Sequence, residues 1–283
     1  MTRTDPGGGT PASGSAGATG PVAVVTGAAR GIGAATVLAL ADAGWSVLAV
    51  DSAADDPALP YPMGTSTELS GVVGQAAERT GAGRVASFVA DVRDPEAVAA
   101  AVAEAERRWG GLDAAIAAAG VIAGGVPLWE VPLDQQQAVL DVDLGGVLSL
   151  ARAAVPALLR RPAPRSGRFL AVASAAATRG LPMLAAYCAA KAGVTGLIRA
   201  LAAELAGSGV TANAVSPGST ATPILDESAR LYRLPGAGAF AGQQPAGRLL
   251  DPAEIAAVLA FLASPASSGM TGAIVPVDGG LAL

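Results

Sequence analysis

Short apolar runs alternate with longer amphipathic segments from residue 21 to the end of the chain. A run of about four to eight apolar residues between turn residues is typical of a buried strand, whereas apolar residues spaced three and four apart indicate a helix. Strands are therefore predicted at residues 21–25, 46–50, 84–89, 112–118, 168–172, 210–215 and 273–277. Predicted helices end near residue 43 and near residue 80, open at residue 94, and span residues 133–159, 184–205 and 255–262. Strands alternating with helices form a parallel sheet covered on both faces, so the pattern predicts one α/β domain, a doubly wound, seven-stranded Rossmann fold over residues 21–283.

Two segments interrupt this alternation. Residues 1–20 are rich in Gly, Ser, Ala, Thr and Pro and lack an apolar core, so they are predicted to be a disordered tail rather than a secretory signal. Residues 52–70 form an insertion that is too long and too rich in proline for an ordinary strand-to-helix connection. The insertion starts at the end of the second strand and carries Leu59, Tyr61 and Met63, so it is predicted to fold over a bound cofactor.

The first predicted strand runs directly into a glycine-rich turn and a helix. In the sequence T-G-A-A-R-G-I-G, Gly27, Gly31 and Gly33 let the backbone approach a pyrophosphate, and the helix N-terminus supplies N–H groups. A tight turn that needs glycine only for packing is the alternative. Asp51 ends the second strand, where a carboxylate accepts hydrogen bonds from the adenosine ribose and repels a 2′-phosphate. This position favours NAD over NADP, with a turn-forming aspartate as the alternative.

Tyr187 and Lys191 stand four residues apart in a predicted helix, and Lys191 is the only lysine in the chain. Residues at this spacing share one helical face, so the ammonium and the phenol can meet. An unperturbed tyrosine has a pKa of about 10, and a nearby cation lowers that pKa and makes the phenol a usable acid or base. A surface lysine beside a half-buried tyrosine is the alternative.

Composition narrows the possible chemistry. The chain has 283 residues, of which 52% are hydrophobic and 14% charged, with a net charge of -5, so neither nucleic acid nor an acidic membrane surface is predicted as a partner. No histidine is present, which excludes a Ser-His-Asp triad and the common zinc sites, and no metal site is predicted. Cys188 is the single cysteine and excludes an internal disulfide. No apolar run is predicted to span a membrane, and a soluble, cytoplasmic protein is expected.

Six motifs, in their order and spacing, resemble those of the short-chain dehydrogenase/reductase (SDR) family. They are the glycine-rich turn, Asp91-Val92, Ala119-Gly120, Ser174, the Tyr187 and Lys191 pair, and Pro217-Gly218. The resemblance covers residues 21–283 and implies an NAD-dependent oxidoreductase that transfers hydride between an alcohol or carbonyl substrate and nicotinamide. The implied catalytic residues are Ser174, Tyr187, Lys191 and Asp143. The implied cofactor-binding residues are Gly27, Arg30, Gly31, Ile32, Gly33, Asp51, Ser52, Asp91, Val92, Ala118, Ala119, Gly120, Tyr187, Lys191, Pro217, Gly218, Thr220 and Thr222.

The resemblance also implies a division of roles. Ser174 would orient the substrate oxygen, Tyr187 would exchange the proton, and Lys191 would hold the nicotinamide ribose and lower the tyrosine pKa. The chain departs from the family at two places, because Ala117 and Ala118 and then Asp143 stand where the family usually has asparagine. An aspartate can accept a hydrogen bond from a water in a proton relay, but it cannot donate unless it is protonated. A structural residue inside a helix is the alternative for Asp143.

A narrower resemblance rests on the insertion sequence L-P-Y-P-M-G-T-S-T-E-L, on the segment around the Tyr187 motif and on G-R-L-L-D-P. These segments are similar to the mycofactocin-coupled subset of the family. That similarity implies NAD that stays bound and is reoxidised in place by mycofactocin, a peptide-derived carrier that acts as the external electron acceptor. The alternatives are an ordinary carbonyl reductase or alcohol dehydrogenase with exchangeable NAD(P)(H), and a non-catalytic nucleotide-sensing protein, which would be expected to lose the tyrosine or the lysine.

Residues 222–247 occupy the position of the family's substrate lid. Their apolar members predict a small-molecule pocket with apolar walls, with packing of the lid onto the protein as the alternative for some of them; they are Ile224, Leu225, Leu231, Tyr232, Leu234 and Phe240. Family members are commonly tetramers, so the resemblance also implies a homotetramer with the helices around residues 134–160 and 184–205 at its interfaces.

Overall fold

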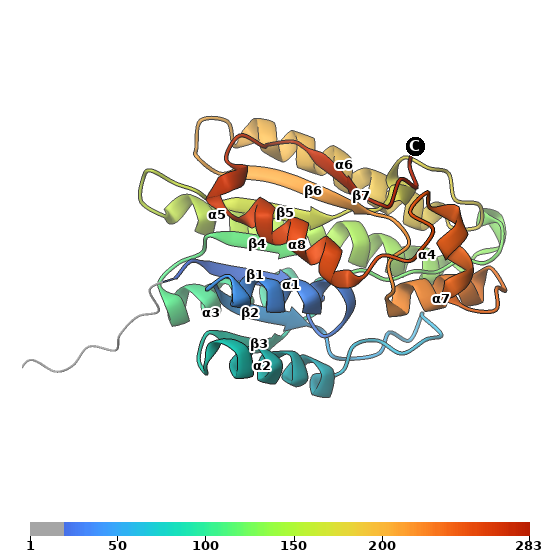
Figure 1. Ribbon diagram of the computed structural model, residues 1–283, viewed down its shortest axis with the longest axis horizontal. Helices are drawn as coiled ribbons and strands as arrows, with labels where there is room; N and C mark the ends of the chain where they lie inside the picture. Colours follow the sequence, from blue (N-terminus) through green and yellow to red (C-terminus); the bar gives the residue numbers. More distant parts are fainter. Residues whose placement is uncertain (1–19) are drawn as a thin grey trace, which may run out of the picture.

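A single parallel sheet forms the centre of the protein (Figure 1). The computed structural model describes residues 20–283, which contain seven strands in the order β3-β2-β1-β4-β5-β6-β7. The strands are β1 (Val22–Thr26), β2 (Ser46–Asp51), β3 (Val85–Val89), β4 (Ala114–Ala117), β5 (Arg168–Val172), β6 (Thr211–Pro217) and β7 (Ile274–Val277). The prediction of a seven-stranded, doubly wound α/β fold is confirmed. Most of the predicted N-terminal tail, residues 1–19, lies outside the described residues.

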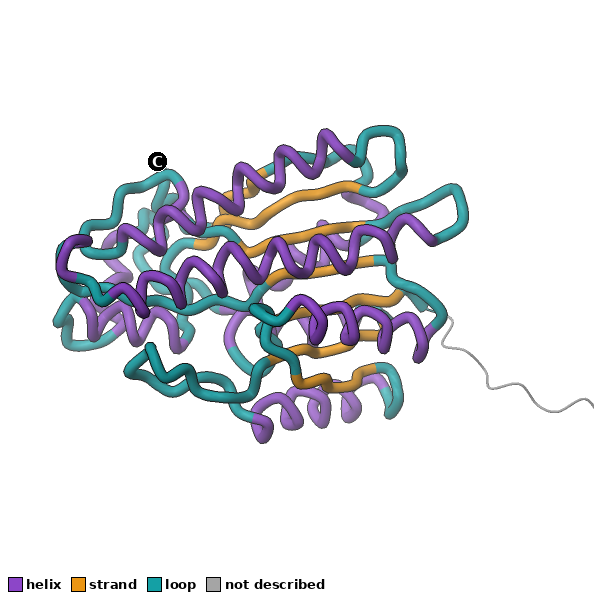
Figure 2. The backbone as a smooth tube through the Cα atoms, turned by 180° about the vertical axis from the view of Figure 1, so that it is seen from behind, coloured by secondary structure: helices purple, strands orange, loops and turns teal. Residues whose placement is uncertain are grey.

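Helices cover both faces of the sheet (Figures 1 and 2). The longer helices are α1 (Gly31–Asp42), α2 (Ser66–Thr80), α3 (Pro95–Trp109), α4 (Leu133–Leu140), α5 (Gly146–Arg160), α6 (Ala185–Glu204), α7 (Pro223–Leu231) and α8 (Pro252–Ala263). Short helical turns are η1 (Leu128–Glu130), η2 (Asp141–Gly145), η3 (Ala175–Ala177), η4 (Ala237–Gln243) and η5 (Pro265–Ser267). One hydrophobic core joins α1, α2 and α8 to the sheet, and another joins α3, α5 and α6 to its opposite face.

The predicted helix over residues 133–159 is not continuous. It divides into α4 and α5, and the π-helical turn η2 (Asp141–Gly145) lies between them. A π turn accommodates one more residue than an α turn, and such turns occur frequently at functional sites. Asp143 lies in this widened turn and is fully buried. Pro156 is located within α5.

The insertion is shorter than predicted. Thr65 caps α2 through a capping box, in which its hydroxyl accepts from the Glu68 N–H and the Glu68 carboxylate accepts from the Thr65 N–H. This reciprocal pair satisfies two backbone donors at the helix start. The helix therefore begins at Ser66, so the insertion ends at Thr65, and the predicted end near residue 70 was wrong.

One helical stretch within residues 20–283, Leu133–Arg160, is long and apolar enough to cross a membrane by length and composition alone. The prediction that no apolar run is long enough to span a membrane was therefore wrong for this stretch. Half of the most apolar window of this stretch is buried inside the protein. Within the stretch, α5 packs against β4, β5 and α3. The packing of α5 into the core accounts for the apolar character of its sequence.

Replacing Gly33 by alanine is expected to destabilise the fold, because the added Cβ would collide with the Gly27 carbonyl oxygen where α1 packs closely against the end of β1. The matched control is Gly71→Ala in α2, where an added Cβ meets no atom within 4 Å. Alanine is favoured over glycine inside a helix by about 1 kcal/mol, so the control variant is expected to be slightly more stable than the wild type. Thermal unfolding of the two variants measures both effects, and equal shifts of the two midpoints would contradict this interpretation.

Candidate active site

The strand order reverses between β1 and β4, and ligands of doubly wound sheets bind in the crevice beside the carboxyl ends of such strands. A cavity of about 620 Å³ opens there. The predicted site residues that line this cavity are Gly27, Arg30, Gly31, Ile32, Gly33, Ala118, Gly120, Ser174, Tyr187, Lys191, Pro217, Gly218, Thr220 and Thr222. The predicted site residues outside its lining are Asp51, Ser52, Asp91, Val92, Ala119 and Asp143.

The glycine-rich turn places the start of α1 at this cavity. Gly27 has φ +66°, and a Cβ there would lie 2.6 Å from the Ala119 backbone, so only glycine fits the close approach of the two loops. The N-cap residue Arg30 makes no side-chain cap to α1, which leaves the first N–H groups of the helix without that partner. Gly31, Ile32 and Gly33 line the cavity beside these donors. Unsatisfied N–H groups and the helix dipole fit the pyrophosphate of a dinucleotide.

Two carboxylates lie beyond the cavity, at the ends of β2 and β3. Asp51 accepts hydrogen bonds from the N–H groups of Ala29 (3.0 Å) and Ala53 (3.1 Å), so its side chain is fixed between the glycine-rich turn and the insertion. Burial raises the pKa of Asp91, but hydrogen bonds from Arg93 outweigh that effect and leave the pKa below its ordinary value. Asp91 is therefore ionised at neutral pH.

Helix α6 presents Tyr187 and Lys191 on one face. The Lys191 Nζ lies 5.6 Å from the centre of the Tyr187 ring and donates to the Val172 carbonyl at 3.2 Å. Ser174 follows β5, and its hydroxyl accepts from the Ala176 N–H at 3.1 Å. Burial raises the pKa of the Tyr187 hydroxyl, and Lys191 opposes this shift without reversing it. The predicted lowering of the tyrosine pKa by Lys191 is thus present as a contribution but does not dominate.

Asp143 and Lys191 form a buried ion pair. Their Oδ2 and Nζ atoms are 3.0 Å apart, and the exposed fractions of the two side chains are 0% and 5%. The other carboxylate oxygen, Oδ1, accepts from the Val121 N–H at 2.8 Å, in the loop that follows Gly120. Burial lowers the pKa of Lys191, but the Asp143 carboxylate and Tyr187 together outweigh burial, so the net pKa is raised and the ammonium stays charged. Burial raises the pKa of Asp143; the positive charge of Lys191 opposes this rise, but the net pKa stays above its ordinary value.

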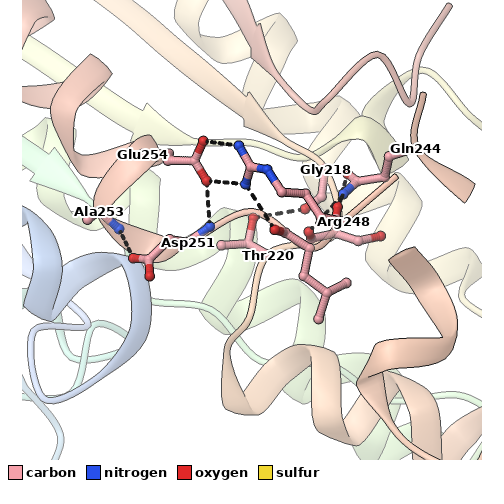
Figure 3. Close-up of polar contacts among 9 residues, drawn as sticks. Gly218, Thr220, Gln244, Arg248, Asp251, Ala253 and Glu254 are labelled. Carbon is pink, nitrogen blue, oxygen red and sulfur yellow. Dashed lines mark hydrogen bonds and ion pairs between the residues drawn. The ribbon is translucent and has the colours of Figure 1, made fainter. Parts of the chain in front are cut away.

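The loop after β6 is held by a polar network (Figure 3). The buried side chain of Gln244 accepts from the Ser219 N–H at 2.8 Å and donates to the Arg248 carbonyl at 2.6 Å. Arg248 in turn makes two hydrogen bonds of 2.7 Å to Glu254, which belongs to the capping box that starts α8. This network fixes the segment from Pro217 to Thr222 against the cavity, and it gives a structural role to the G-R-L-L-D-P motif.

The insertion is attached to the site through contacts that the sequence analysis did not identify. Arg30 donates to the Pro62 carbonyl at 2.8 Å, and Arg93 donates to Asp56 at 2.6 Å. The Tyr61 hydroxyl accepts from the Ile122 N–H at 2.8 Å. These partners lie between 32 and 61 positions apart in the sequence, so no local pattern reveals them.

Most of the predicted lid residues line the cavity. They are Ile224, Leu225, Tyr232, Leu234 and Phe240. Tyr232 packs edge-on against Phe240, and its hydroxyl donates to the Pro182 carbonyl at 2.7 Å. Leu231 lines a separate, smaller cavity beside Pro60 of the insertion instead. The lining also contains residues that the sequence did not single out, among them Ile122, Arg179 and Leu281.

The doubly wound sheet, the glycine-rich turn at a helix start and the Tyr187 and Lys191 pair define a nicotinamide-dependent oxidoreductase. The family model described as enoyl-(acyl carrier protein) reductase matches residues 27–282. The chain belongs to the short-chain dehydrogenase/reductase family.

Comparison with known proteins gives relatives that span nearly the whole chain. The cis-4-hydroxycyclohexanecarboxylate dehydrogenase of Sinomonas cyclohexanicum is 39% identical over 92% of this chain and 95% of its own length. The (-)-trans-carveol dehydrogenase of Rhodococcus erythropolis is 34% identical over 93% of this chain and 98% of its own. The crystal structure of carveol dehydrogenase from Mycobacterium avium in complex with NAD superimposes with a TM-score of 0.86 at 33% identity, over 94% of this chain and 99% of the other.

Proposed function

We propose that this chain is an NAD-dependent alcohol dehydrogenase that also reduces the corresponding carbonyl compound. The observation that carries the proposal is the meeting of Ser174, Tyr187 and Lys191 in one cavity with the glycine-rich turn. A hydride passes between the carbinol carbon and the nicotinamide, which the bound cofactor supplies, so the protein has only a proton to manage. The relatives named as dehydrogenases of ring-bearing alcohols support an alcohol or ketone as the substrate.

Each residue of the site has a proposed task. Tyr187 accepts the proton of the alcohol hydroxyl, and Ser174 holds the same oxygen by a hydrogen bond. Lys191 stabilises the phenolate that forms on Tyr187 and binds the nicotinamide ribose. Asp143 keeps Lys191 charged through the buried ion pair and accepts from a water in the proton relay, in place of the family asparagine. A general base with a raised pKa is ionised more fully as the pH rises, so alcohol oxidation is faster in alkaline solution.

The proposed cofactor is NAD. The glycine-rich turn, the open helix start of α1 and Arg30 would hold the pyrophosphate, and Thr220 and Thr222 would contact the nicotinamide half. Asp51 would accept from the adenosine ribose, and Ser52, Asp91 and Val92 would contact the adenosine half. N–H partners hold both carboxylate oxygens of Asp51, and this carboxylate would lie close to a 2′-phosphate, which disfavours NADP.

We also propose that NAD stays bound between turnovers and is reoxidised in place by mycofactocin. Support comes from the insertion, whose attachments to Arg30, Arg93 and the Ile122 N–H reach both the glycine-rich turn and the loop after β4. A segment fixed at both places would cover the route by which a dinucleotide leaves. Native mass spectrometry after prolonged dialysis tests this proposal, with one retained NAD for each chain as the expected result.

Turnover measurements distinguish an enzyme that retains its NAD from one that exchanges it. With mycofactocin or a dye as the acceptor, the dialysed protein is expected to oxidise an alcohol without added NAD. Loss of NAD on dialysis, with full activity restored by free NAD, would instead identify an ordinary dehydrogenase with an exchangeable cofactor. Binding of NAD with no redox turnover on a broad panel of alcohols, with the acceptor present, would identify a nucleotide-sensing protein.

The Asp56→Ala variant is expected to release NAD about tenfold faster, because a hydrogen bond to a charged group contributes roughly 1.5 to 3 kcal/mol. The variant removes the attachment of the insertion to Arg93. Exchange of bound NAD for isotopically labelled NAD, followed by native mass spectrometry, measures the rate. The matched control is Asp42→Ala, which breaks the exposed ion pair with Arg79 elsewhere on the surface. Equal exchange rates in the two variants would contradict the proposed role of the insertion.

Assembly as a homotetramer in the cytoplasm is proposed on the same family grounds. The exposed Leu133 and Leu148, at the start of α4 and on α5, support an interface around residues 134–160. Native mass spectrometry of the same samples gives the mass of the assembly directly.

A further inference from the structure

The charged side chains that line the active-site cavity all carry the same sign. They are Arg30, Arg179 and Lys191, and no acidic residue belongs to the lining. Arg30 donates to the insertion and lies at the glycine-rich turn, and Lys191 is paired with Asp143. In the proposed function, Arg30 binds the pyrophosphate of NAD and Lys191 binds the nicotinamide ribose. Arg179 remains without a task in hydride transfer.

Arg179 is held between the two segments that carry the catalytic groups. Its N–H donates to the Ala175 carbonyl at 3.0 Å, directly after Ser174, and its own carbonyl accepts a weak contact from the Cys188 thiol at 3.8 Å, directly after Tyr187. The exposed guanidinium donates from Nη1 to the Leu281 carbonyl at 2.6 Å, and both residues line the cavity. Within residues 20–283, no carboxylate lies close enough to Arg179 to form an ion pair.

The rest of the substrate side of the cavity is mainly apolar. Its walls are formed by Ile122, Leu181, Leu184, Ile224, Leu225 and Phe240. Apolar walls favour a hydrocarbon body, and a cation beside them provides one position for a group of opposite charge. A guanidinium is suited to this purpose, because its planar N–H groups match the two oxygens of a carboxylate.

We infer that the substrate is an apolar alcohol that carries a carboxylate, and that Arg179 binds this carboxylate while Ser174 and Tyr187 hold the hydroxyl. The inference rests on the proposed function, and it adds the substrate class, a hydroxy acid with a ring or chain between its two polar ends. Arg179 is the residue that distinguishes such an acid from a neutral alcohol of the same shape.

Binding of a matched pair of ligands tests the inference without turnover. Cyclohexanecarboxylate and cyclohexanecarboxamide have nearly the same shape and differ in charge, and isothermal titration calorimetry on the protein as purified gives both dissociation constants. The wild type is expected to bind the acid about tenfold more tightly than the amide, as one charge-assisted contact provides. Arg179→Gln is expected to abolish this preference, and Arg179→Lys to retain part of it.

The control variant is Arg107→Gln, which removes one positive charge from an exposed side chain of α3, where Arg108 still neutralises Glu104. It is expected to leave the tenfold preference unchanged. Equal affinity of the wild type for acid and amide, or an undiminished preference in Arg179→Gln, would overturn the inference. Thermal unfolding of the Arg179 variants shows whether they are folded, so that a change in the preference for acid over amide is interpreted only for folded protein.

Kinetics separate this inference from the proposed function. A hydroxycyclohexanecarboxylate and its amide are compared as substrates, and kcat/KM for the acid is expected to fall about tenfold in Arg179→Gln while the value for the amide stays the same. Turnover of both compounds at equal rates, with no effect of Arg179→Gln, rejects the substrate class but leaves the dehydrogenase in place. Preferential binding of the acid with no turnover of either compound rejects the dehydrogenase but leaves the carboxylate site in place.

Discussion

Replacement of Tyr187 by phenylalanine is expected to lower kcat for alcohol oxidation by about 10³-fold, because general acid-base catalysis contributes roughly 10² to 10⁴-fold. The variant removes the hydroxyl that would take the substrate proton and leaves the ring in place beside Lys191. NAD binding is expected to persist, since the glycine-rich turn is untouched. Single-turnover rates measured on protein with bound NAD separate the chemical step from cofactor loss.

The control for this variant lies in the same cavity. Tyr232 also lines it, and its hydroxyl donates to the Pro182 carbonyl rather than facing a catalytic group. Tyr232→Phe makes the same chemical change and is expected to keep kcat within a few-fold of the wild type. Wild-type turnover by Tyr187→Phe would remove the central residue from the proposed mechanism.

Replacement of Asp143 by alanine is expected to lower the free energy of unfolding by about 3 to 5 kcal/mol, because it leaves the buried Lys191 ammonium without its partner. The variant also leaves the Val121 N–H without the acceptor that it now has. Asp143→Asn keeps the shape and can still accept from that N–H, so a smaller loss is expected. Urea unfolding at about pH 7 measures both variants.

The dependence of stability on pH distinguishes the ion pair from simple packing. In the wild type the pKa of Lys191 is raised, so the stabilisation is present at neutral pH and is lost as the pH rises through that raised pKa. In Asp143→Ala the burial of Lys191, which is the largest influence and lowers its pKa, is opposed only by the weaker effect of Tyr187. The variant is then expected to recover stability as the pH rises from about 7 toward about 9.5, through the lowered pKa. If Asp143→Ala is less stable than the wild type by the same free energy at both pH values, the charge of Lys191 does not cause the loss of stability.

Local patterns in the sequence were sufficient for the sheet and for most of the cavity lining. Each strand carries its own apolar run, and the glycine-rich turn, Ser174 and the Tyr187 and Lys191 pair each follow a strand or lie on one helical face. Such signals depend on residues within one turn or one strand, and tertiary packing agrees with them here.

The features that the sequence did not predict depend on distant partners or on a small change of helical period. The π turn around Asp143 adds one residue within a segment whose apolar spacing still indicates one helix, so the pattern over residues 133–159 concealed it. The role proposed for Arg179 depends on its place beside two other cations in one cavity, which no local pattern in the sequence predicts.

The insertion is attached at three places, to the Arg30 side chain, to Arg93 and to the Ile122 N–H, and its Leu59 and Met63 are buried in a small hydrophobic cluster that they share with the loop after β4 and with α4 and α6. Contacts that are broken together behave as one cooperative unit, so the insertion would open by local unfolding rather than by the swing of a hinged loop. The rate of cofactor exchange would then rise steeply with temperature and with denaturant. With NAD retained as proposed, the enzyme would be insulated from the cellular balance of oxidised and reduced NAD, and the reduction potential of its electron acceptor would set the direction in which it runs.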